Sequence, residues 1–281
     1  KTVELTCKTA EYYGYDDNIY DALLDIYEPG MTVSQLDPLF ADLREAIVPL
    51  VKAVGESPNQ PDTSFLEIGK FSEEKQREFS LKVAESIGFD FDAGRMDTST
   101  HPFCSGAGPN DVRFTTRYDE EFPFGCLYGV MHETGHGTYE QGLLQKHEGT
   151  PMGQAVSLGV HESQSRMWEN MVGRSHEFWQ YYIEEFKSCF NHLPSDLDVD
   201  TLHRAVNTVK PSLIRVESDE ATYNLHIMLR YELEKKIFNE NLSVKDIPST
   251  WNQMFNEWFG IEVTEDRMGC LQDIHWSMGA F

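Results

Sequence analysis

The sequence His132-Glu133-Thr134-Gly135-His136 carries the clearest chemical pattern in this chain. Residues four apart on an α-helix lie one turn apart on the same face, so both imidazoles can bind one metal ion. Glu133 lies next to them, where its carboxylate can take a proton from a metal-bound water. This pattern is typical of zinc hydrolases, and the alternative is a pair of surface histidines on an ordinary helix.

A third ligand has to come from elsewhere, because a hydrolytic zinc site uses three protein ligands and an open position. The sequence His161-Glu162-Ser163-Gln164 opens a second helical pattern, far enough after His136 for a turn and an antiparallel return. Glu162 would complete a site of two histidines and one glutamate. On spacing alone, a solvated helix residue remains the alternative for Glu162.

Four further groups of residues combine charged, amide or aromatic side chains in short stretches. Taken singly, each has an ordinary structural interpretation, such as a turn histidine before proline or an arginine paired with acidic neighbours. They are His101-Pro102-Phe103, Asp111-x-Arg113-x-Thr115, Ile214-Arg215 leading into Asp219-Glu220, and Gly269-x-x-Gln272-Asp273-x-His275-Trp276.

Together, these six motifs resemble the ordered signature of the carboxypeptidase Taq family of metallocarboxypeptidases, across nearly the whole chain. The resemblance implies a mainly α, helical zincin-like metallopeptidase with a small antiparallel β-sheet beside the active-site helix. It also implies one Zn²⁺ or Co²⁺ per chain, with His132, His136 and Glu162 as metal ligands and Glu133 as the catalytic general base.

The same resemblance implies hydrolysis of C-terminal residues from peptides that have a free C-terminus. Arg215 and Arg113 would bind the terminal carboxylate, His275 would line the site and assist catalysis as an oxyanion donor, and His101 would contact substrate. A cytoplasmic homodimer is also implied. The alternatives are another HExxH oligopeptidase or aminopeptidase, or a metal-binding fragment without turnover. Family members are longer, and the chain starts at Lys1, so we expect a fragment of a family-type protein.

The composition narrows the class of protein. The chain has 281 residues, of which 40% are hydrophobic and 12% aromatic, so it can bury a sizeable core. Its 23 basic and 47 acidic residues give a net charge of −24, which argues against nucleic acid or an anionic membrane as partner. The five cysteines are scattered and form no CxxC pair, which indicates neither a disulfide framework nor a thiolate zinc site.

The spacing of apolar residues predicts which elements position these groups. The HExxH motif falls in a helix over 122–144 and Glu162 in a helix over 157–172, while 95–118 predicts a strand pair around a turn at 106–110. A short extended piece is expected at 212–216, and one catalytic domain over residues 1–281. The other predicted helices are 34–55, 72–87, 175–191, 198–209, 219–239 and 243–259.

Overall fold

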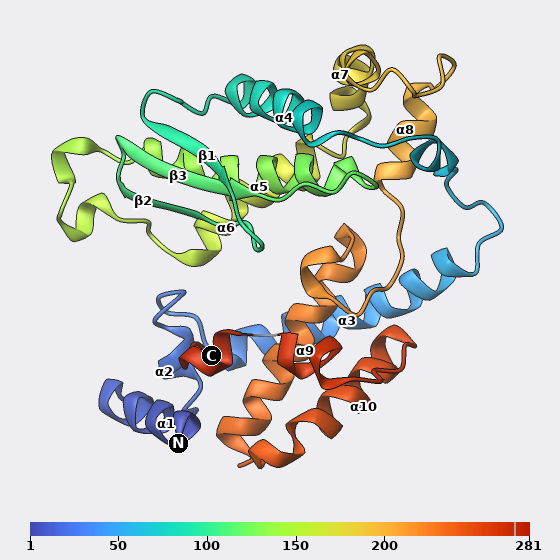
Figure 1. Cartoon of the computed structure of the whole chain (residues 1–281). Coiled ribbons are helices and arrows are strands. Elements are labelled where there is room, and N and C mark those ends of the chain that lie inside the picture. The colour runs from blue at the N-terminus through green and yellow to red at the C-terminus, as the bar shows by residue number, and fades with distance from the viewer. Residues whose placement is uncertain (273) are drawn as a thin grey trace. The chain divides into compact units, whose positions relative to one another are not determined.

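The computed structural model describes residues 1–272 and 274–281 (Figure 1), so Asp273 of the motif at 269–276 lies outside the described residues. The contacts divide the chain into two compact units. Unit 1 combines Lys1–Asn59 with Val209–Phe281, and unit 2 is the continuous stretch Gln60–Thr208. Each unit is described separately, and the single catalytic domain expected over residues 1–281 stays a prediction.

Unit 2 contains the HExxH motif and the small sheet. Its helices confirm the predicted positions, and each begins or ends on a residue that suits the role: Pro123 opens α5 without a lost hydrogen bond, and Gly88 follows α4 with a positive φ of 111°. The elements are α4 (Glu73–Ile87), β1 (Gly94–Thr98), β2 (Cys104–Gly108), β3 (Asp111–Thr116), α5 (Pro123–Gln141), α6 (Leu158–Arg166), a π-helical turn (Met167–Val172), α7 (His176–Cys189) and α8 (Val199–Val206).

The three strands form a mixed sheet in the order β1-β3-β2, which corrects the expected antiparallel sheet. β2 and β3 pair antiparallel around the predicted turn, whereas β1 pairs parallel with β3, with Gly94 opposite Val112 and Thr98 opposite Thr116. Alternation of polar and apolar residues reports which positions face the core, but it does not report strand direction. The segment through His101 reverses the chain between β1 and β2, and the turn between β2 and β3 reverses it again, so β1 and β3 run in the same direction.

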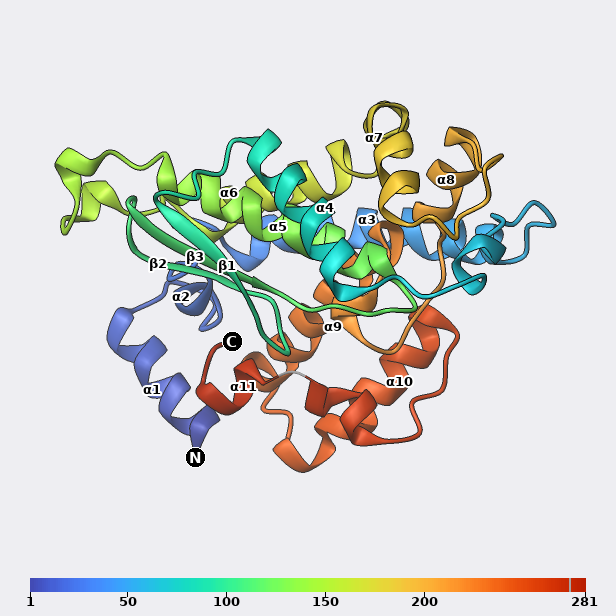
Figure 2. The same cartoon turned by 45° about the horizontal axis from the view of Figure 1, so that its top comes forward.

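Helix α5 is covered on more than one side, which explains why its sequence is so apolar. Cys126 and Val130 pack with Val112 and Phe114 of β3 in one buried cluster. On another side, α5 contributes to an aromatic cluster with α4 and α7, in which Trp179 is fully buried. Figure 2 shows α5 running along the sheet with α4 beside it. This packing holds the HExxH residues on a rigid element.

Unit 1 is a helical assembly built around α9. Its elements are α1 (Thr2–Tyr13), α2 (Asp21–Leu24), α3 (Val33–Gly55), α9 (Glu220–Asn239), α10 (Ile247–Phe259) and α11 (His275–Met278). α3 begins after a capping box formed by Thr32 and Gln35, slightly before the predicted start at residue 34. The expected extended piece at 212–216 is only partly present, because a 3₁₀ turn spans Arg215–Glu217. Among the helices described, none is long and apolar enough to span a membrane.

Candidate metal centre

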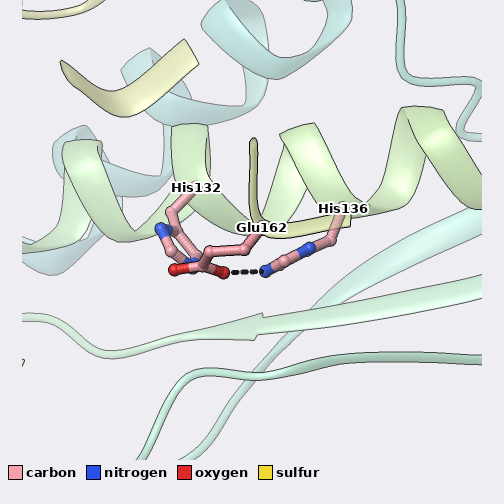
Figure 3. Close-up of side chains that lie close together, drawn as sticks. All are labelled: His132, His136 and Glu162. Carbon is pink, nitrogen blue, oxygen red and sulfur yellow. Dashed lines mark ion pairs between the residues drawn. The ribbon is translucent and has the colours of Figure 1, made fainter. Parts of the chain in front are cut away.

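Helices α5 and α6 bring three metal-ligating side chains together. Glu162 Oε2 lies 3.6 Å from His132 Nε2 and 3.2 Å from His136 Nε2. Figure 3 shows the three side chains converging beside α5. Within the described part of the chain, no other group of three His, Cys, Asp or Glu side chains has its ligand atoms within 4.8 Å of one another.

The separations between these atoms suit a divalent metal ion. Two ligands that each lie about 2.0–2.1 Å from a tetrahedral zinc are about 3.3 Å apart. The two measured distances to Glu162 bracket this value. Two imidazoles and one carboxylate also leave a coordination position open, as catalytic zinc sites do. The residues present therefore fit a catalytic metal.

Gly135 allows α6 to approach α5 closely enough to deliver Glu162. A Cβ atom at this position would lie 2.6 Å from both the carbonyl oxygen of Gln164 and the Cα of Ser165. Real Cβ atoms essentially never make contacts shorter than 3.0 Å. The glycine inside the HExxH sequence therefore sets the spacing between the two helices that carry the three candidate ligands.

His132 is oriented by a buried carboxylate. Its Nδ1 lies 2.8 Å from Glu169 Oε2, which leaves Nε2 for the side that faces Glu162. Glu169 also accepts a hydrogen bond of 2.9 Å from Arg166 Nη1, and Arg174 Nη2 lies 3.8 Å from its other oxygen. Although burial raises the pKa of Glu169, His132 and the two arginines hold it below the ordinary value. Glu169 is therefore a carboxylate when it meets His132.

His136 is contacted by an imidazole instead. Its Nδ1 lies 2.6 Å from Nδ1 of His161, and Nε2 of His161 lies 2.6 Å from Glu140 Oε1. The Tyr139 ring packs against His161 with 4.9 Å between ring centroids. The two histidines of the motif are thus supported by chemically different partners.

The acidic groups at the centre differ in how readily they take a proton. Burial of Glu133, which is 7% exposed, raises its pKa to about 7, and the negative charges of Glu162 and Glu169 act in the same direction. Burial also opposes ionisation of Glu162, but its hydrogen bond with His136 and the charge of His132 lower its pKa to about 2. Glu162 is therefore ionised at neutral pH, whereas Glu133 takes up and releases a proton near pH 7.

Comparison with known proteins identifies the family. The family description that matches is carboxypeptidase Taq (M32) metallopeptidase, over residues 1–281. The chain belongs to this family. Carboxypeptidase 1 of Bacillus subtilis is 47% identical over 279 residues, which are 99% of this chain and 56% of that protein. Thermostable carboxypeptidase 1 of Thermus thermophilus is 48% identical over 263 residues, 94% of this chain and 51% of that protein.

A solved structure agrees with these sequence comparisons. The M32 carboxypeptidase from Deinococcus radiodurans superposes with a TM-score of 0.93 at 42% identity, covering 98% of this chain and 55% of that one. The resemblance seen in the six motifs is therefore confirmed, and so is the mainly helical fold class. This member of the carboxypeptidase Taq family spans about half the length of the curated relatives it matches.

Two of the family-like motifs in unit 2 are joined by Thr115. Its hydroxyl accepts a hydrogen bond from the Phe103 N–H and lies 2.6 Å from the Ser99 hydroxyl. Ser99 in turn donates to the carbonyl of His101. The threonine of the Asp-x-Arg-x-Thr motif therefore fixes the backbone of the His-Pro-Phe loop, while the His101 residue is exposed.

Arg113 pairs with its own motif. Its Nε and one Nη donate to the two carboxylate oxygens of Asp111 at 2.7 and 2.8 Å. Its strand neighbours Val112 and Phe114 are fully buried, whereas the Arg113 side chain is half exposed. Side chains alternate along a strand, so Arg113 lies on the face of β3 away from the cluster shared with α5. Its role in binding substrate stays a prediction.

The remaining predicted residues lie in unit 1. The Arg215 N–H donates to Gln272 Oε1 at 2.9 Å, and Gln272 Nε2 donates to the Leu213 carbonyl at 2.8 Å. Arg215 Nη1 donates to the Tyr223 hydroxyl at 2.9 Å. Two of the sequence motifs, which are distant in the chain, thus meet at Gln272. His275 is the first residue of α11, and its role likewise stays a prediction.

Sequence analysis missed two residues at the candidate metal centre, Glu169 and Glu140, and it named His161 in a motif without giving it a role. Glu169 follows Glu162 by two helical turns, so the spacing alone places the two carboxylates on similar faces. That signal was available. The contact between His136 and His161 was not, because it depends on how closely α5 and α6 approach.

Proposed function

We propose that this chain carries the catalytic metal centre of a metallocarboxypeptidase that removes C-terminal residues from peptides, with zinc or cobalt as its ion. The observation that carries the proposal is the convergence of His132, His136 and Glu162 beside a buried Glu133. Membership of a metallopeptidase family and the names of its carboxypeptidase relatives support the same activity.

His132, His136 and Glu162 would hold the ion. The chemistry supplied by a bound divalent ion is polarisation of the scissile carbonyl and a lower pKa of water, to about 7 in zinc enzymes. Glu133 accepts a proton from the attacking water and passes it to the nitrogen of the leaving amino acid. Its raised pKa suits this exchange, because such a carboxylate both takes and releases a proton near neutral pH.

Selection of the substrate end requires a cation. We assign this role first to Arg215, since a guanidinium grips both oxygens of a carboxylate, and second to Arg113. His275 is proposed as a donor to the oxyanion and His101 as a substrate contact, both from their motifs. A homodimer and a cytoplasmic location complete the proposal.

Blocked peptides test the activity. Purified protein is stripped with a chelator, reloaded with Zn²⁺ or Co²⁺, and mixed with three peptides of one sequence: unmodified, N-acetylated and C-amidated. We expect loss of the C-terminal residue from the first two peptides, detected by mass spectrometry, and none from the amidated one. Cleavage of the amidated peptide from its N-terminus would point to an aminopeptidase. Metal binding without any cleavage would point to a fragment that does not turn over.

A further inference from the structure

The contact between His136 and His161 is short, directional and not used by the mechanism above. The two Nδ1 atoms lie 2.6 Å apart, and Nε2 of His161 lies 2.6 Å from Glu140 Oε1. All three side chains are largely buried, with 16% of His136, 15% of His161 and 28% of Glu140 exposed. A buried chain of polar groups has to match donors with acceptors.

When a metal ion takes Nε2 of His136, only one arrangement of protons makes both contacts of His161 hydrogen bonds with a neutral imidazole at each position. The Glu140 carboxylate only accepts, so His161 Nε2 must carry the proton that it donates. Nδ1 of neutral His161 then has a lone pair and accepts, so His136 Nδ1 must carry the other proton. His136 Nε2, which faces Glu162, is thereby left with its lone pair.

We propose that His161 and Glu140 form a positioning chain that holds His136 in the tautomer and orientation needed for Nε2 to bind the metal ion. This inference deepens the proposed function and rests on it for the identity of the ligand. Glu169 does the same for His132 with a single carboxylate. At His136 the direct partner is the imidazole of His161 on α6, which in turn contacts the carboxylate of Glu140 near the end of α5. Partners of this kind orient the ring and raise the affinity for metal.

Two substitutions of one residue separate positioning from simple packing. His161→Leu removes the acceptor, while His161→Asn keeps a carbonyl oxygen near the place of Nδ1. We expect the zinc dissociation constant, measured on stripped protein by competition with a chromophoric chelator, to rise about 10–100-fold in the leucine variant. The asparagine variant should recover most of that loss. His176→Leu removes a half-exposed histidine bonded to Asp200 in the same unit and serves as the matched control.

A second measurement reads the contact between the two histidines directly and needs no metal. In stripped protein with ¹⁵N-labelled histidine, the spectrum should show a hydrogen-bonded proton between the Nδ1 atoms of His136 and His161, and His161→Leu should abolish this signal. Equal zinc affinity and an unchanged His136 spectrum in the leucine variant would overturn the proposal. So would equal losses in the leucine and asparagine variants, with folding checked by circular dichroism. Failure of the unmutated protein to cleave peptides would refute the proposed function but leave this spectrum unaffected.

Discussion

Replacing Gly135 by alanine should weaken zinc binding without touching any ligand. The new Cβ would lie 2.6 Å from two backbone atoms of α6, at Gln164 and Ser165. Ordinary contacts are 3.4–4 Å, so the helices must separate by about 0.8 Å. Metal–ligand distances tolerate about 0.2 Å. Glu162 travels with α6, so the separation is too large for the site to absorb unchanged.

The size of the effect follows from the cost of overpacking, about 1–3 kcal/mol. If the metal-free protein relaxes by moving α6 away, this cost falls on zinc binding and raises the dissociation constant by about 5–150-fold. If the helices cannot separate, the same cost appears in the free energy of unfolding instead. Both quantities therefore need measuring, by chelator competition and by urea denaturation of the stripped protein.

Gly129→Ala is the matched control on the same helix. A Cβ there would lie 3.9 Å from Thr116 Oγ1 and 4.0 Å from Pro102 Cγ, which is ordinary contact. Alanine in a helix is favoured over glycine by about 1 kcal/mol, so this variant should be as stable as the parent or more so. The reasoning about Gly135 is refuted if the two variants have the same zinc affinity and the same urea midpoint.

The remaining predictions concern the proton acceptor, the substrate cation, a carboxylate partner and a buried histidine. Glu133→Gln should keep its metal and lose nearly all turnover, because it removes the base but no ligand, and metal analysis beside a peptidase assay checks both. Arg215→Ala should lose about 1.5–3 kcal/mol of binding free energy for a peptide with a free C-terminus, which is measured as a raised KM. Equal cleavage of free and amidated peptides by the parent protein would argue against this role. Glu169→Gln should weaken zinc binding about 10–100-fold. Lys70→Gln, which removes an exposed ion pair with Glu121, is the control and should leave zinc binding unchanged. Burial beside Phe255 and the charge of Arg215 lower the pKa of His226 to about 4, so the folded state favours the neutral imidazole. This stabilisation is fully present above pH 6.5, and about 3 kcal/mol of the free energy of unfolding is lost as the pH falls from 6.5 to 4. Urea titrations should find a smaller loss in His226→Gln.

The sequence predicted that the two candidate histidine ligands lie together, because helical spacing converts directly into geometry. Two histidines four apart share a face on any α-helix, and the apolar pattern around them indicated a buried one. The direction of β1 could not be predicted in the same way, because residue alternation is identical in parallel and antiparallel pairs. The partner of His136 was also out of reach, since it depends on the close approach at Gly135.

Arg113 illustrates a different limit. Its motif marked it as a substrate cation, but its guanidinium forms two bonds with Asp111, two positions away on the same strand face. Residues i and i+2 of a strand point the same way, so this pairing was readable from the spacing. A motif names a residue, whereas only its neighbours decide what the side chain is available to bind.

The discontinuity of unit 1 has a consequence for how this protein is made. The residues of unit 2 are contiguous, so all contacts within it can form once residue 208 has left the ribosome. The core of unit 1 joins Val51 to Trp251 and Phe255, which are synthesised far apart. At about 5–20 residues per second, α3 waits about 4–15 s for residues 209–281 after unit 2 is complete. During that interval the apolar side chains of α3 are accessible to chaperones and to neighbouring nascent chains. We therefore expect misassembly on the polysome to begin at α3.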